Sequence, residues 1–109
     1  MSYIEPKSAQ EFDSAIESAL KNDPYVVIYY TATWCGPCRA IAPVFTKSSQ
    51  DNTNVKFFKV DIDLTQESPR VATISSVPKF EFYKSGSKVS EFAGASAANL
   101  NKSVADLQA

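Results

Sequence analysis

The sequence has no histidine among its 109 residues. This absence removes the commonest general base at neutral pH, the usual partner of a catalytic cysteine and the nitrogen ligands of most transition-metal sites. Any chemistry must therefore rest on other side chains. A metal site within one copy of the chain is disfavoured.

The sequence also lacks a surplus of charge of one sign and any long apolar run. Its net charge is -1, with 21% charged residues, which disfavours a nucleic-acid partner. No stretch approaches the roughly 20 apolar residues of a membrane span, and the first residues do not form a secretory signal. We expect a single folded domain over residues 1–109 with no membrane partner. The expected location is the cytoplasm, or a mitochondrion or other organelle if a targeting segment was removed.

Only two cysteines are present, Cys35 and Cys38. Two are too few for the disulfide framework of a small secreted protein. A bridge that closes so short a loop stabilises a fold by only roughly 2 kcal/mol, against about 4.7 kcal/mol for a hundred-residue loop. Stability is therefore a weak reason for the pair, and a reducing compartment is expected.

Apolar periodicity predicts alternating helices and strands in the first half of the chain. Ser8 and Glu11 form a capping-box pair at the start of a helix. The segment 25–30 is apolar on both faces, as in a buried central strand. A helix-like segment then extends from the cysteines to Lys47, and a second strand covers 55–60.

The second half is predicted to contain a helix, a hairpin and a final helix. Asp63 and Gln66 form a capping pair for a helix that reaches about Ala72 or Ile74. Segments 79–84 and 88–92 flank a glycine-containing turn and predict an antiparallel hairpin. Ser96 is expected to cap the final helix. With a short edge strand near the N-terminus, these elements predict an α/β fold, a three-layer α/β/α sandwich around a mixed sheet of four to five strands.

The spacing of the cysteines predicts a redox pair. Residues at i and i+3 in the first turn of a helix have Cα atoms about 5 Å apart, within the range of a disulfide. The helix dipole stabilises a thiolate at Cys35, which is the expected nucleophile. Cys38 lies one turn inside and is the expected resolving thiol. Gly36 is expected to relieve steric limits, and Pro37 to stiffen the loop.

At these residues the sequence resembles the thioredoxin family, because Trp34-Cys35-Gly36-Pro37-Cys38 follows a hydrophobic strand. The likeness spans nearly the whole chain and includes Val77-Pro78 before the hairpin. It implies a thioredoxin-like fold with a cis Val77–Pro78 peptide beside the sulfur atoms, and a Val77 backbone that hydrogen-bonds to an extended substrate. The implied flat substrate surface comprises Trp34, Gly36, Pro37, Val77, Pro78, Gly94 and Ala95.

The sequence departs from the family at Tyr29, where thioredoxins typically have a buried aspartate that takes the proton of the resolving thiol. A tyrosine, with an ordinary pKa near 10, cannot act as a carboxylate-like base at neutral pH. Lys59 matches the lysine that partners this aspartate. We hypothesise that its neutral amine, or water held by Tyr29, serves Cys38 instead. Lys79 follows Pro78 and is expected to place positive charge near the groove.

The predicted function is that of a general protein-disulfide reductase with no bound cofactor. The resemblance implies a flavin-containing thioredoxin reductase as electron donor. It also implies peroxiredoxins, ribonucleotide reductase and methionine sulfoxide reductases as classes of target.

Two alternatives remain open at this point, although a monomeric enzyme is expected. The chain could be a binding or scaffold subunit whose redox chemistry is incidental, and the missing aspartate supports that alternative. It could also form a dimer that pools four sulfur ligands for zinc or an iron–sulfur cluster.

Overall fold

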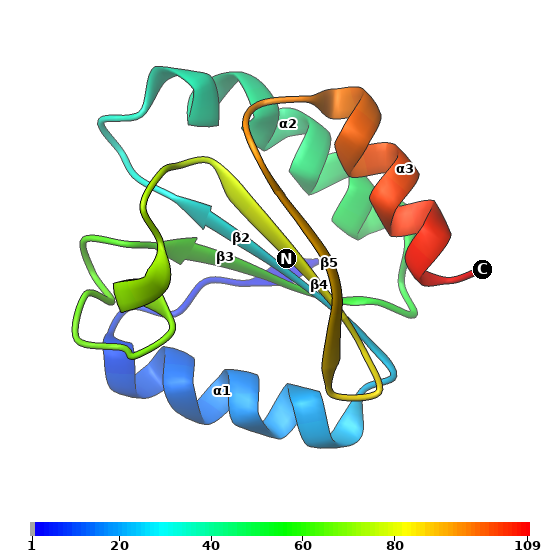
Figure 1. Ribbon diagram of the computed structural model, residues 1–109, viewed down its shortest axis with the longest axis horizontal. Helices are drawn as coiled ribbons and strands as arrows, with labels where there is room; N and C mark the ends of the chain where they lie inside the picture. The colour runs from blue at the N-terminus through cyan, green and yellow to red at the C-terminus, as the bar shows by residue number, and fades with distance from the viewer. Residues whose placement is uncertain (1) are drawn as a thin grey trace.

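The computed structural model describes residues 2–109 and has helices on both faces of a five-stranded sheet (Figure 1). The strand order is β1-β3-β2-β4-β5, with β1, β3 and β2 parallel and β4 and β5 antiparallel to their neighbours. This confirms the predicted three-layer sandwich. In chain order the elements are β1 (Tyr3–Ile4), α1 (Ala9–Asn22), β2 (Tyr25–Thr31), α2 (Gly36–Asp51), β3 (Lys56–Asp61), a short 3-10 helix (Val71–Thr73), β4 (Lys79–Lys84), β5 (Ser87–Ala93) and α3 (Ala97–Leu107).

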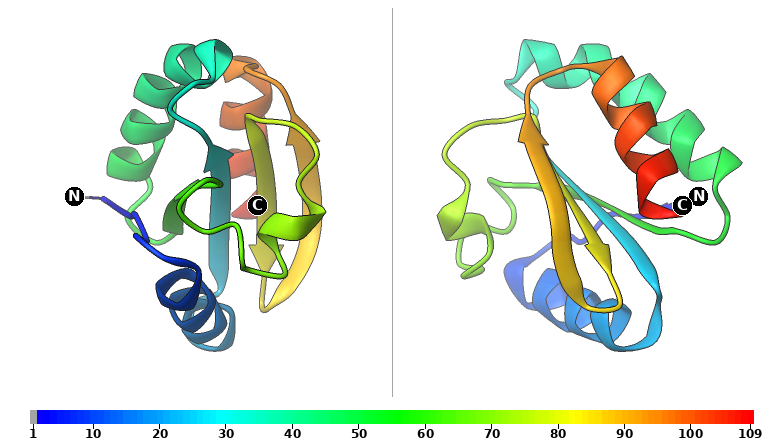
Figure 2. Two further views of the ribbon diagram at one scale, coloured as in Figure 1. Left: turned by 90° about the vertical axis from the view of Figure 1, so that its left-hand side faces the viewer. Right: turned by 45° about the vertical axis from the view of Figure 1, so that its right-hand side comes forward.

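The layers are unequal. Helix α1 and the segment with the short 3-10 helix cover one face of the sheet, and α2 and α3 lie side by side on the other (Figure 2). No helix among residues 2–109 is long and apolar enough to cross a membrane.

Two helices begin where the sequence predicts, because a serine caps each of them. The side chain of Ser8 accepts a hydrogen bond from the backbone N–H of Glu11 at 3.1 Å, and that of Ser96 accepts one from Asn99 at 3.1 Å. Each serine satisfies a donor that the first helical turn cannot pair internally.

Strand β2 is the centre of the structure and divides it into two apolar cores. Val27 and Tyr29 face α2 and α3, whereas Val26, Ile28 and Tyr30 face α1. All five are at most 1% exposed. A strand buried on both faces explains the uninterrupted apolar run in the sequence.

The helix predicted from Asp63 to about Ile74 is wrong. This segment forms turns and only the short 3-10 helix before β4. The N–H of Asp63 bonds to the Asp61 side chain at 2.9 Å, which forms a local turn instead of a helix cap. Pro69 then lacks the N–H that a continuing helix needs, and the Ser68 hydroxyl donates to Asp13 of α1 at 2.6 Å.

The hairpin tip packs closely against the end of α1. Gly86 has φ of +84°, and a Cβ atom there would lie 3.1 Å from the backbone oxygen of Leu20. The N–H of Ser85 donates to the oxygen of Pro24 at 2.9 Å. Both the backbone conformation and the contact therefore favour glycine at this turn.

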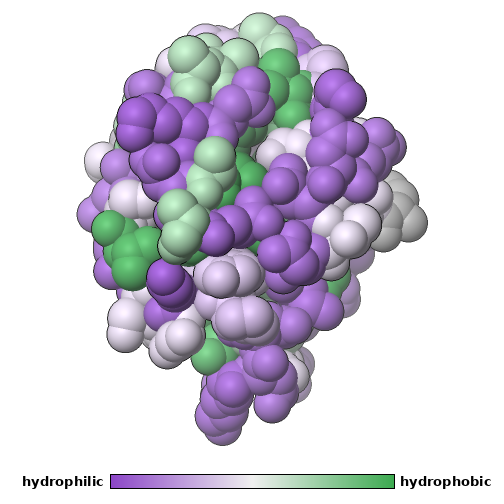
Figure 3. Space-filling view, turned by 90° about the vertical axis from the view of Figure 1, so that its right-hand side faces the viewer, coloured by the Kyte–Doolittle hydropathy of each residue, from purple (hydrophilic) through white to green (hydrophobic). Residues whose placement is uncertain are grey.

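The free edge strand β5 contains a β-bulge. Phe82 pairs with Ser90 but Tyr83 pairs with Lys88, so Val89 has no partner in β4. The bulge interrupts the edge, and the surface on this side is largely hydrophilic with scattered hydrophobic residues (Figure 3). Such features oppose edge-to-edge pairing of sheets.

Candidate active site

The two cysteines form a disulfide at the start of α2. Cys35 is the N-cap residue, with φ of -90° and ψ of 109°, and Pro37 lies in the first turn. The two Cα atoms are 5.3 Å apart, in agreement with the spacing predicted from the sequence. The backbone N–H of Cys38 donates to Sγ of Cys35 at 3.2 Å. The sulfur therefore occupies the position at which a helix N-terminus stabilises negative charge.

The disulfide is almost completely enclosed. Cys35 is 4% exposed and Cys38 is 1% exposed. The pair packs against Ala32, Ile62 and Val77. Only a small part of Cys35 is left in contact with solvent. The order of exposure is the predicted one, with the second cysteine deeper, but the difference is small in the oxidised state.

The loop before β4 supplies the wall beside Cys35. The Val77–Pro78 peptide is cis, as the family resemblance implied. The carbonyl oxygen of Val77 lies 3.7 Å from Sγ of Cys35, and the N–H of Gly94 donates to the oxygen of Pro78 at 2.9 Å. The structure thus brings together residues that are far apart in the sequence, and Ala95 follows in the exposed turn before α3.

Trp34 stands at the rim of the site and is 64% exposed. Its indole N–H donates to Oδ2 of Asp63 at 2.8 Å, a contact that the sequence analysis missed. Next to it, a Cβ atom on Gly36 would meet nothing within 4 Å. The expectation that Gly36 relieves a steric limit within the chain is therefore wrong. The space above this backbone is open to a binding partner.

A cavity of about 270 Å³ lies behind Cys38, and both Tyr29 and Lys59 line it. The Tyr29 hydroxyl donates to the backbone oxygen of Cys38 at 2.9 Å. Burial raises the pKa of Tyr29, against a smaller opposing contribution from a hydrogen bond with Thr31. Tyr29 is therefore a neutral hydrogen-bond donor at physiological pH.

The ring of Tyr29 belongs to the core. It stacks on Phe80 with 4.8 Å between ring centroids, which agrees with a packing role. Lys59 is half-buried, and its Nζ lies 5.8 Å from the centroid of the Tyr3 ring.

The charge of Lys79 is paired. Its Nζ lies 2.9 Å from Oε1 of Glu91 on the neighbouring strand, and the Lys79 side chain is 24% exposed. The hydrogen bonds with Lys79 and Lys88 hold the pKa of Glu91 below its usual range. The expected positive charge beside the groove is thus neutralised across the hairpin.

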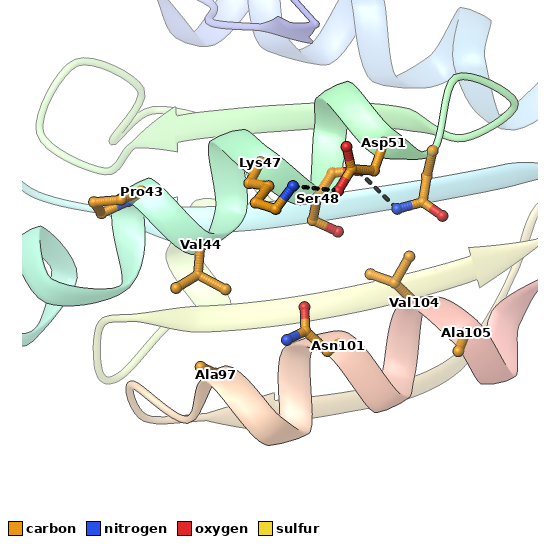
Figure 4. Close-up of a pocket in the computed structure, with 10 residues that line it drawn as sticks. Pro43, Val44, Lys47, Ser48, Asp51, Ala97, Asn101, Val104 and Ala105 are labelled. Atoms are coloured by element: carbon orange, nitrogen blue, oxygen red, sulfur yellow. Dashed lines mark hydrogen bonds and ion pairs between the residues drawn. The ribbon is translucent and has the colours of Figure 1, made fainter.

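A larger groove of about 610 Å³ lies between α2 and α3 (Figure 4). Lys47 and Asp51 form an ion pair at 3.0 Å along one side, Val44 points from α2 toward α3, and Val104 points from α3 toward α2. The groove runs along the later turns of α2, whereas the cysteines lie at its first turn. It therefore does not belong to the disulfide site.

Comparison with known proteins gives one consistent family. The Thioredoxin family model matches residues 4–106. "Putative thioredoxin-5" of Dictyostelium discoideum is 45% identical over 107 residues, which cover 96% of this chain and 98% of the relative. The solved structure of thioredoxin O2 from Arabidopsis thaliana in the oxidised state has a TM-score of 0.87 at 36% identity, covering 97% of this chain and 94% of that one.

A further solved structure has a TM-score of 0.81 at 28% identity, covering 96% of this chain and 95% of that one. It concerns the thiol-resolving mechanism of yeast mitochondrial 1-Cys peroxiredoxin via glutathione/thioredoxin systems. These similarities do not favour the scaffold alternative. With the CxxC disulfide described above, they show that the chain belongs to the thioredoxin family and is a thiol-disulfide oxidoreductase.

Proposed function

We propose that this chain is a general protein-disulfide reductase in which Cys35 attacks and Cys38 resolves. The observation that carries this proposal is the position of Cys35 as the N-cap of α2, with its sulfur accepting the N–H of Cys38 at 3.2 Å. A thiolate is stabilised at such a helix terminus, and the thiolate is the attacking species in disulfide exchange.

The reaction has two exchange steps. The Cys35 thiolate attacks one sulfur of a substrate disulfide, forms a mixed disulfide and releases the other substrate sulfur as a thiolate. Cys38, once deprotonated, attacks Sγ of Cys35, which restores the disulfide within the chain and releases the second substrate thiolate. The substrate gains two electrons and takes up two protons, and the dithiol of this chain is oxidised.

The roles of the two cysteines are tested by replacing each of them with serine, one at a time. Cys35→Ser is expected to abolish turnover of a protein disulfide. Cys38→Ser is expected to accumulate the mixed disulfide, which mass spectrometry detects. Turnover that survives in Cys35→Ser, or a mixed disulfide on Cys38 in wild type, would refute the assignment.

We propose that the proton of Cys38 leaves through the cavity behind it, to water or to Lys59. Cys38, Lys59 and Asp61 all line this cavity, and this shared lining supports the path. Tyr29 is excluded as a base because its hydroxyl is already a donor to the Cys38 oxygen. Its proposed contribution is to orient the backbone of Cys38.

The contribution of Lys59 is measured with Lys59→Met in single-turnover resolution of the mixed disulfide. The matched control is Lys102→Met, which removes an equally charged side chain that is 75% exposed on α3. If Lys59→Met resolves no more slowly than the control, Lys59 is not the base and water in the cavity remains the proposed acceptor.

For partners, we propose a flavin-containing thioredoxin reductase as donor and peroxiredoxins, ribonucleotide reductase and methionine sulfoxide reductases as targets. The family supports reductase and disulfide partners in general. The yeast structure that concerns a peroxiredoxin supports that class in particular. We also propose a cytoplasmic location. Trapping with Cys38→Ser in cell extract, followed by identification of the bound proteins, tests the partners, and microscopy of the tagged chain tests the location.

A further inference from the structure

A buried carboxylate lies on the side of the sheet that faces α1, and the exchange mechanism does not use it. Glu81 of β4 is 6% exposed. Its Oε1 accepts hydrogen bonds from the hydroxyls of Tyr30 at 3.2 Å and Tyr83 at 3.0 Å. Its Oε2 faces Nζ of Lys88 at 3.7 Å. We refer to Glu81 and the four side chains around it, Tyr30, Arg70, Tyr83 and Lys88, as the Glu81 cluster.

The bulge in β5 supplies the cation of this cluster. Because Val89 is unpaired, Lys88 stands opposite Tyr83 and shares a face with Glu81 and Glu91. Regular pairing would turn Lys88 to the other face, since side chains alternate along a strand. Glu81 and Glu91 are themselves opposite each other, so a cation between them offsets the repulsion of two carboxylates.

The cluster is linked to both ends of the loop that lies against the disulfide, through Arg70 upstream and by way of Glu91 downstream. Upstream, Arg70 donates to the Tyr83 hydroxyl at 3.3 Å, and Arg70 directly precedes the short 3-10 helix that leads to the loop. Downstream, Lys79 adjoins Pro78 and pairs with Glu91 at 2.9 Å, and Glu91 pairs with Lys88 at 3.2 Å.

A network of this kind specifies geometry more than it adds stability. Apolar residues of similar volume could replace a buried ion pair with little loss of stability. A carboxylate oxygen that accepts two hydroxyl groups, by contrast, fixes their directions, and removing a member leaves buried polar groups unpaired. Ile74 and Val77 pack on the same core as Tyr30 and Tyr83, so the loop and the cluster are in one packed unit.

We propose that Glu81 is a positioning residue that, through this cluster, fixes the Val77–Pro78 backbone and thereby sets the affinity for protein disulfides. This inference rests on the proposed function, in which that backbone binds an extended substrate. A small disulfide needs only the sulfur of Cys35, whereas a protein segment also needs the loop in the correct place. Glu81 itself does not contact substrate.

The test compares Glu81→Gln with wild type on insulin and on a small chromogenic aryl disulfide. The KM for insulin is expected to rise about fivefold, within the usual range of coupling between sites. The kcat for insulin and the rate with the small disulfide are expected to stay within about twofold of the wild-type values. A twofold ratio corresponds to only about 0.4 kcal/mol of activation free energy. Glu17→Gln, an equivalent change at a 70% exposed side chain of α1, is the control and should match wild type.

Hydrogen exchange gives a second readout that does not depend on activity. Amides of residues 74–79 are expected to exchange faster in Glu81→Gln than in Glu17→Gln. An unchanged insulin KM together with unchanged exchange in this loop would overturn the proposal, as would an equal loss on both substrates. If Glu81→Gln does not fold, Tyr83→Phe removes one hydroxyl and the Arg70 contact, and the same outcomes decide. A wild type that fails to reduce insulin would refute the proposed function, whereas the exchange data would still decide the positioning role.

Discussion

Replacement of Tyr29 by phenylalanine separates a structural role of this residue from a chemical one. The change removes the hydroxyl that donates to the Cys38 oxygen at 2.9 Å and keeps the ring stacked on Phe80 at 4.8 Å. The aromatic packing around the ring is retained. Loss of one hydrogen bond of this kind costs about 0.5 to 1.5 kcal/mol, so we expect Tyr29→Phe to lower the free energy of unfolding by about 1 kcal/mol.

The assay is guanidinium unfolding followed by circular dichroism, for both the oxidised and the reduced chain. Tyr25→Phe is the matched control, because the Tyr25 hydroxyl has no hydrogen-bond partner within residues 2–109 and the variant should unfold like wild type. The rate of mixed-disulfide resolution is measured on the same samples. It is expected to fall by less than about tenfold, a factor that corresponds to roughly 1.4 kcal/mol of activation free energy.

Two results would refute this reasoning about Tyr29. A variant as stable as wild type would mean that the hydrogen bond contributes nothing. A fall in the resolution rate well beyond tenfold, with normal stability, would mean that the hydroxyl takes part in proton transfer and not only in orientation.

Three further predictions concern the stability of the fold. Burial and the Glu81 carboxylate raise the pKa of Tyr83 to about 12. Because the hydroxyl of the unfolded chain loses its proton at a lower pH, the free energy of unfolding should fall as pH rises above about 10. The fall should be less steep in Tyr83→Phe. An equal slope in that variant would contradict the assignment. Phe45→Ala empties a site that is 0% exposed between three aromatic rings and should cost about 3 to 5 kcal/mol in denaturant unfolding; a cost below about 1 kcal/mol would show that the core collapses around it. Ser68→Ala removes the 2.6 Å bond to Asp13 and should cost about 1.5 kcal/mol, measured by thermal unfolding, with unchanged stability as the contradicting result.

Sequence patterns predict correctly those helices, strands and turns that depend on residues close together in the chain. The Ser8 cap, the apolar run of β2 and the turn at Gly86 each depend on residues within a few positions of one another, and each is found as predicted. The helix predicted after Asp63 is the exception, since it does not form. Its capping pattern is outweighed by Pro69 and by the long-range bond between Ser68 and Asp13, and no local periodicity contains that contact.

The candidate site likewise has some features that the sequence predicts and others that depend on contacts between distant residues. The cysteine spacing predicts the disulfide and the helix terminus from geometry alone, and the family resemblance supplies the cis Val77–Pro78 peptide. The contact of Tyr29 with the Cys38 oxygen depends on how α2 packs on β2, and the pairing of Lys79 with Glu91 depends on strand register. A one-residue bulge can change that register, so these contacts could not be predicted from the sequence.

The close approach of Gly86 to Leu20 makes this hairpin tip a poor place for engineering. Surface turns are usually the first choice for inserting an epitope tag or fusing a reporter, because loop tips tolerate additions. Here the turn is held against the end of α1, and an insertion would have to displace that helix end. Tags for purification or imaging are better attached at the C-terminus, beyond α3, where the last residue is exposed.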